Sequence, residues 1–176
     1  LAPGPGTCMV MGTASTMALV AEAMGMMLPG GAAIPAVHAD RLRHAEATGA
    51  RAVALASEGL RPSRIMTQAA MRNAMRVLQA VGGSTNGVVH LAAIAGRLGF
   101  DLDLEELDRL GTETPVLVDL KPSGMHYMED LFRAGGLTTV LREIGHLVDR
   151  DCLTVTGRSL GENIDAEPPS WPQETV

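Results

Sequence analysis

Aromatic residues are scarce in this 176-residue chain, which holds 2% Phe, Trp and Tyr but 11 methionines. The aromatic positions are Phe100, Phe132, Tyr127 and Trp171. A core made without large rings must be filled by Ala, Leu, Val and flexible Met side chains, which fill irregular spaces but specify them weakly. The hydrophobic content of 46% is nevertheless normal for a folded domain and argues against disorder.

Other absences exclude whole classes of protein. Two cysteines, 144 positions apart, make no disulfide framework. No uninterrupted apolar run reaches the 18 residues of a membrane span, and no basic start with an apolar stretch resembles a signal peptide, so we expect a cytoplasmic protein with no membrane partner. The net charge of −6 argues against nucleic-acid binding, which needs a basic face.

Hydrophobic spacing and capping residues predict a helix-rich chain. The first helix is apolar nearly all round, with Glu22 as its lone charge, and is expected to be buried. The helix after Ser84 is also almost entirely apolar, so we expect it to be central, with His90 as a hydrogen-bonded core residue. Helices are predicted over residues 13–28, 36–57, 63–81, 84–98, 103–111 and 128–144, the last with a break at Gly135-Gly136.

Two short strands complete the predicted fold. Residues 115–120 read as a buried strand, and residues 153–157 alternate like a second strand that begins a new unit. The prediction is therefore an α/β fold, rich in helix and with fewer strands than a complete sheet needs. The Leu1 start and the Pro-rich residues 168–172 both read as cuts through a longer polypeptide.

Cys8 is the first candidate for chemistry. It lies in a Gly- and Pro-rich loop that leads into a helix N-terminus, where the helix dipole and free backbone N–H groups favour a thiolate. From its surroundings in sequence it could be a nucleophile, a metal ligand or an inert side chain. No CxxC partner is present, so spacing alone predicts no metal site.

Two loops are candidates for ligand binding. The turn at 82–87 places Ser84, Thr85 and Asn86 before a helix, where they either bind a carboxylate or phosphate or simply cap the two helices. The loop at 121–124, with Ser123, follows a predicted strand, as ligand loops of α/β proteins do, but is equally plain turn chemistry. The five histidines show no metal-binding spacing, and Cys152 is expected to be a packing residue.

Several blocks of the chain, in order, resemble the iron–sulfur dehydratases, the family of dihydroxyacid, 6-phosphogluconate and sugar-acid dehydratases. The Thr-Cys-x-x-Met-Gly-Thr-Ala-Ser-Thr-Met form of the first block is most similar to the sugar-acid (arabinonate, xylonate) subgroup. The resembling blocks are residues 6–17, 21–30, 82–86, 119–124, 128–136 and 153–157.

The resemblance implies a hydro-lyase that converts a 2,3-dihydroxy acid to a 2-keto acid. It implies an iron–sulfur cluster, 2Fe–2S or 4Fe–4S, whose open iron acts as a Lewis acid on the C3 hydroxyl, and a Mg²⁺ ion near the substrate carboxylate. Cys8 matches the third of three cluster cysteines. The hydroxyl and amide side chains named above, together with Thr13, are our candidates for contacts with the hydroxy-acid substrate.

The resemblance also implies what this chain leaves out. The other two cysteines and most Mg²⁺ ligands are expected upstream, and the catalytic serine downstream in a β-barrel-like domain, so no catalytic residue is assigned here. Residues 1–152 would be part of an α/β cluster and substrate domain, and residues 153–176 a linker and the start of the next domain. A homodimer or tetramer is expected, and the 176 residues alone are expected to be inactive.

Two alternatives remain open beside the sugar-acid reading. One is the dihydroxyacid dehydratase of branched-chain amino-acid biosynthesis. The other is a non-catalytic unit, either a folding or interaction domain or a binder of small molecules at the 83–86 turn.

Overall fold

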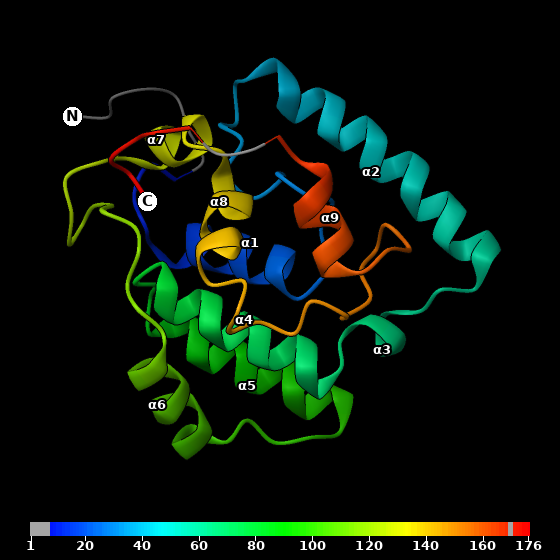
Figure 1. The fold of residues 1–176 in the computed structure, drawn as a ribbon. Coiled ribbons are helices and arrows are strands. Elements are labelled where there is room, and N and C mark those ends of the chain that lie inside the picture. The colour runs from blue at the N-terminus through cyan, green and yellow to red at the C-terminus, as the bar shows by residue number, and fades with distance from the viewer. Residues whose placement is uncertain (1–7, 169–170) are drawn as a thin grey trace.

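The computed structural model describes residues 8–168 and 171–176 and is built from helices (Figure 1). None of these helices is long and apolar enough to cross a membrane. The helices in this part of the chain are α1 (Thr13–Ala23), α2 (Ala39–Glu58), α3 (Pro62–Ile65), α4 (Gln68–Ala80), α5 (Asn86–Leu98), α6 (Leu104–Glu113), α7 (Met128–Arg133), α8 (Gly136–Glu143) and α9 (Leu160–Ala166).

Helix α1 lies at the centre and packs along α4 (Figure 1). Its side chains enter both hydrophobic clusters of the core. Leu19 and Ala23 join a cluster with α7, α8 and α9, while Val20 and Met24 join a cluster with α4, α5 and α6. The expected burial of this helix is confirmed, because six of its eleven residues are buried, including the charged Glu22.

Helix α1 is shorter than predicted because the chain turns at Gly25. This glycine has φ +82°, and a Cβ there would lie 2.9 Å from the carbonyl oxygen of Leu153. The carbonyl of Gly25 accepts a hydrogen bond from Val155 N at 2.8 Å. The first helix therefore ends where residues 153–155 cross it, a long-range contact that local sequence does not reveal.

The helix-rich prediction is confirmed, but the two predicted strands do not form a sheet in the described residues. Residues 115–119 form neither helix nor strand. Leu117 N donates to the carbonyl of Ala80 at the end of α4, and Asp119 N donates to Thr175 O. Only isolated bridges occur there, Leu120 with His126 and Leu153 with Ser159. An alternating or apolar run makes a strand only when another strand pairs with it.

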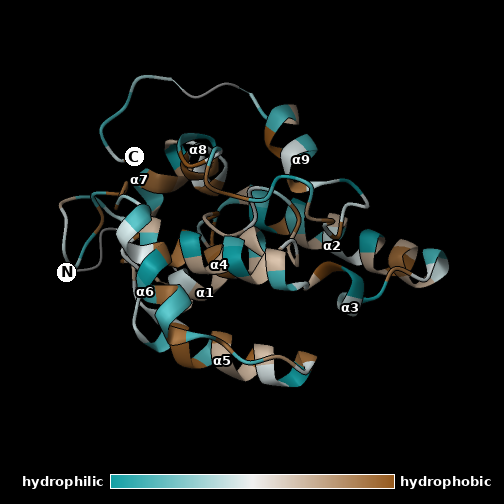
Figure 2. Ribbon diagram, turned by 60° about the horizontal axis from the view of Figure 1, so that its bottom comes forward, coloured by the Kyte–Doolittle hydropathy of each residue, from teal (hydrophilic) through white to brown (hydrophobic). Residues whose placement is uncertain are grey.

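The expectation that helix α5 is central is wrong. It lies at the edge of the molecule (Figure 2), and only Gly87, Leu91 and Ala95 are buried, one narrow stripe at four-residue spacing. Val89 is 68% exposed, and His90 is exposed rather than a core residue. The apolar composition of this helix predicts burial on all sides, whereas the four-residue spacing of its buried residues shows that only one face packs against the core.

Helix α2 is solvated along its length and contains no buried residue. The predicted helix over 63–81 is divided, because Thr67 caps α4 by accepting a hydrogen bond from Ala70 N. Helix α6 continues past Gly111 to Glu113. Helix α9 was not predicted, although Ser159 and Glu162 form a capping box whose Ser-x-x-Glu pattern is visible in the sequence.

Two buried polar side chains join helices to loops. Asn73 on α4 is 1% exposed and bonds both the N–H and the carbonyl of Asp149 at 2.8 Å. Glu22 on α1 is 5% exposed, and its two carboxylate oxygens accept the N–H groups of Gly30 and Ala32, each at 2.8 Å. Each side chain thereby fixes a loop that has little regular structure of its own.

Burial raises the pKa of Glu22 from 4.5 to about 7, opposed by its bonds from Ala32 and Gly30 and reinforced by the negative charge of Glu167. A cavity of about 20 Å³ beside Glu22 is otherwise lined by neutral side chains. Because the folded state binds this proton more tightly than the unfolded chain, the stabilisation linked to the proton is fully present below pH 4.5 and is lost as pH rises through 7.

We therefore expect Glu22→Gln to flatten the stability profile. Between pH 4.5 and 7.5 the unfolding free energy of the wild type should fall by about 3 kcal/mol more than that of the variant, because a glutamine at position 22 does not titrate. Denaturant unfolding at several pH values measures this difference. Parallel profiles for the two proteins would contradict the assignment.

Candidate functional site

The loop at 8–12 carries Cys8 and is held by backbone hydrogen bonds to a distant segment. Met11 N donates to Lys121 O at 2.7 Å, and Met128 N donates to Met9 O at 2.9 Å. Gly12 then serves as the N-cap of α1. The thiol is thus placed at the start of the central helix by residues more than 100 positions away.

The Cys8 thiol lies among groups that favour its ionised form. Burial disfavours the thiolate, but hydrogen bonding with the Ser15 side chain and with backbone groups of Val10, Gly12 and Ser15 outweighs it and lowers the pKa of Cys8 below 9.0. As a thiol, Cys8 donates to Val10 O at 3.2 Å, and Ser15 Oγ donates to the same carbonyl at 2.9 Å. Ionisation gives up the first bond but places negative charge at the N-terminus of α1.

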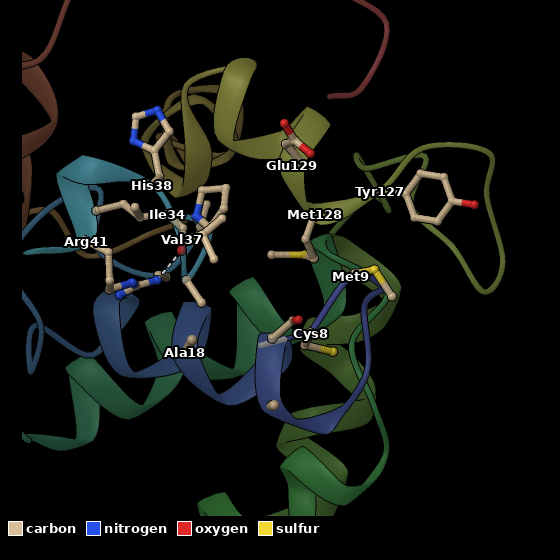
Figure 3. Close-up of a pocket in the computed structure, with 16 residues that line it drawn as sticks. Cys8, Met9, Ala18, Ile34, Val37, His38, Arg41, Tyr127, Met128 and Glu129 are labelled. Carbon is tan, nitrogen blue, oxygen red and sulfur yellow. Dashed lines mark hydrogen bonds between the residues drawn. The ribbon is translucent and has the colours of Figure 1, made fainter. Parts of the chain in front are cut away.

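Cys8 lines a cavity of about 660 Å³ between the start of α1 and the segment that precedes α2 (Figure 3). Cys8 and Ala18 lie below the cavity as drawn, and Ile34 and Val37 lie above it. The lining residues also include Met9, Ala14, Ser15, Ala32, Ala33, Pro35, Ala36, His38, Arg41, Tyr127, Met128 and Glu129.

The centre of this cavity is mostly apolar. The side chains of His38, Tyr127 and Glu129 point away from it in Figure 3. Arg41 donates a hydrogen bond to the carbonyl of Ile34. Among the polar side chains that line the cavity, this leaves the Cys8 thiol and the buried Ser15. Residues 32–37 form an apolar wall of the cavity above α1. This wall is not among the features predicted from the sequence, although the apolar run at 32–37 after Gly30-Gly31 is visible there.

The structure brings three of the predicted substrate residues together at the N-terminus of α1. Thr13 Oγ1 lies 3.1 Å from Ser84 Oγ and accepts from Asn86 Nδ2 at 3.0 Å. The turn approaches closely because Gly83 has no side chain; a Cβ there would lie 2.8 Å from the Thr16 methyl carbon. These hydroxyl and amide groups therefore bond one another, and none of them lines the Cys8 cavity.

The other predicted residues lie apart from this group. Thr85 is exposed at the start of α5. Ser123 is exposed in the 121–124 turn, whose neighbour Lys121 donates through Nζ to Tyr127 Oη at 2.9 Å. A role in substrate binding stays a prediction for all five side chains.

Cys152 differs from Cys8 in every respect that matters for chemistry. It is packed against the core cluster of α4, α5 and α6. Burial raises the pKa of its thiol to about 11, and the nearby carboxylate of Asp149 adds to the rise. A thiol in these surroundings stays protonated, in agreement with the expected packing role.

The described residues fit one ligand of an iron–sulfur cluster and not a whole site. A thiol of lowered pKa beside a cavity is the donor chemistry that iron in such clusters takes. Within residues 8–168 and 171–176, however, no group of three or more His, Cys, Asp or Glu side chains could hold a metal ion.

Comparison with known proteins finds dehydratases. The family model described as dihydroxy-acid/6-phosphogluconate dehydratase N-terminal matches residues 1–163. The chain is 49% identical over 164 residues to a dihydroxy-acid dehydratase of Ignicoccus hospitalis, covering 92% of this chain and 30% of that protein.

Sugar-acid dehydratases match equally well. An L-arabonate dehydratase of Azospirillum brasilense is 52% identical over 90% of this chain and 28% of its own length. An L-arabinonate dehydratase of Rhizobium leguminosarum is 48% identical over 97% of this chain and 30% of its own length. The chain thus spans about 30% of these relatives. With a family model matching most of its length, this chain belongs to the dihydroxy-acid/6-phosphogluconate dehydratase family.

Proposed function

We propose that this chain is part of a hydro-lyase that dehydrates a 2,3-dihydroxy sugar acid to a 2-keto-3-deoxy acid. The observation that carries the proposal is the Cys8 thiol, held at a helix N-terminus beside a cavity in a chain of the dehydratase family. The relatives named above as dehydratases support the reaction class.

The overall reaction removes the C2 proton and the C3 hydroxyl of the acid as water, and the resulting enol tautomerises to the 2-keto acid. When bound, an iron–sulfur cluster with an open iron supplies a Lewis acid for the departing hydroxyl. In this chain, Cys8 would be one thiolate ligand, kept in place by the backbone bonds of Met11 and by Ser15. The apolar wall at 32–37 would exclude water from that end of the site.

The remaining machinery is proposed to lie outside these residues. Two further cluster cysteines, the Mg²⁺ ligands and the base for the C2 proton are expected in the other parts of an α/β domain and in a following β-barrel-like domain. A cytoplasmic homodimer or tetramer is part of the same proposal. The non-catalytic alternative explains neither the family match nor the lowered pKa of Cys8.

A second substrate class is favoured by the dihydroxy-acid dehydratase of Ignicoccus hospitalis, whose identity of 49% is close to the 52% of the arabonate enzyme. We expect the full-length protein to form keto acid from L-arabinonate at least tenfold faster, at equal concentration, than from 2,3-dihydroxy-3-methylbutanoate. A keto-acid assay with both compounds decides between them. The reverse preference would assign the branched-chain reaction, and turnover of neither compound would contradict both readings.

Replacement of the thiol tests the ligand. In the full-length protein, Cys8→Ser should lower the iron content and reduce dehydration at least 100-fold, because a hydroxyl replaces a thiolate ligand, while the helical circular dichroism signal persists. Cys152→Ser is the matched control and should retain iron and activity. Full iron content in Cys8→Ser would remove Cys8 from the ligand set.

The 176 residues by themselves test how much of the site they contain. After incubation with iron and sulfide under reducing conditions, we expect no visible cluster absorbance and no keto-acid formation, because one thiolate cannot hold a cluster with an open iron. A coloured product that dehydrates L-arabinonate would overturn this expectation.

A further inference from the structure

The segment at 29–38, which includes the apolar wall at 32–37 above the Cys8 cavity in Figure 3, has neither helix nor strand. Its own backbone bonds are few, Gly31 N to Leu28 O at 3.2 Å and His38 N to Pro35 O at 3.0 Å. Its shape therefore depends on side chains that reach it from neighbouring helices.

These side chains approach from two sides. From α2, Arg41 donates to the carbonyl of Ile34, and the His44 ring lies 3.2 Å from the carbonyl oxygen of Leu28. From α1, Glu22 accepts the N–H groups of Gly30 and Ala32. Glu22 is the fully buried member of this set, so water cannot replace it if it is removed.

Glu22 and the cavity are connected through one helix. Cys8 leads into the first turn of α1, Ala14 and Ala18 form the floor of the cavity, and Glu22 lies one turn further along. After α1 the chain reverses at Gly25 and Gly30, both of which have positive φ. It then runs back across the cavity from Ala14 and Ala18, and residues 32–37 form the opposite wall. The two bonds to Glu22 lie where this return begins, one at Gly30 and one at the first wall residue, Ala32.

We propose that Glu22 is a positioning residue of the dehydratase site, whose carboxylate fixes the backbone of Gly30 and Ala32 and thereby sets the wall of the substrate cavity opposite Cys8. This inference rests on the proposed function. The Cys8 loop is held by separate contacts, to Lys121 and Met128, that do not involve Glu22. Loss of the carboxylate should therefore disturb substrate binding while the thiolate stays in place.

The test uses Glu22→Gln in the full-length protein, with L-arabinonate and 2,3-dihydroxy-3-methylbutanoate as probes. The amide keeps the size of the side chain but presents an NH₂ group to one of the two N–H donors, so one hydrogen bond becomes a repulsion. For whichever compound the wild type turns over, assayed at pH 8 where Glu22 is ionised, we expect KM to rise about tenfold, kcat to stay within twofold, and the iron content to be unchanged.

Asn73→Ala is the matched control, because Asn73 is also buried and also bonds a loop backbone twice, but does not line the cavity. It should lower the melting temperature without changing KM. An unchanged KM in Glu22→Gln, or the same KM rise in Asn73→Ala, would overturn the inference. Turnover of neither compound by the wild type would instead contradict the proposed function.

A measurement on the wild type covers the case in which Glu22→Gln does not fold. Amide hydrogen exchange of peptides spanning residues 29–34 should be as slow as that of peptides from α1, because buried N–H groups bonded to a carboxylate are protected. Exchange as fast as that of the exposed residues of α2 would show that the wall is not held and would overturn the inference.

Discussion

The candidate site depends on backbone hydrogen bonds between two loops that are far apart in sequence. Met11 N with Lys121 O, and Met128 N with Met9 O, place the Cys8 loop against the segment that leads into α7. A thiol on a free loop would sample many positions, whereas this one occupies a defined place at the N-terminus of α1. The loop depends in turn on the core beneath it, where Met11 and Met128 are both buried in the same cluster.

Helix α1 connects the parts of this arrangement. One end receives the Cys8 loop, its middle contributes Leu19 and Val20 to different core clusters, and its other end carries Glu22. A charged residue is rarely fully buried without partners, and here the partners are two loop N–H groups. The same helix therefore positions the thiol, forms the cavity floor and anchors the opposite wall.

Local sequence predicted most of the helices because their ends carry chemical signals. Asp103 caps α6 through a side-chain oxygen that accepts a backbone N–H group, as its place before the predicted helix indicates, whereas the caps at Thr67 and Ser159 were not predicted. The predicted strands do not form for the opposite reason, since an apolar run such as 115–119 needs a partner strand that the described residues do not supply. Helix α5 differs from the prediction because its apolar composition predicts burial all round, whereas only residues at four-residue spacing are buried.

The sequence predicts only those parts of the site whose residues are close together along the chain. Cys8 and the helix after it form a local pattern, and the cluster of Thr13, Ser84 and Asn86 was named residue by residue but not as a group. Glu22 was visible as a lone charge in an apolar helix, yet its partners are backbone amides of a loop eight and ten residues later, which leave no mark in the side-chain pattern. A lone carboxylate in an otherwise apolar, buried helix therefore predicts that N–H groups lie close enough to bond it. The turn directly after the helix is the first place to expect those N–H groups.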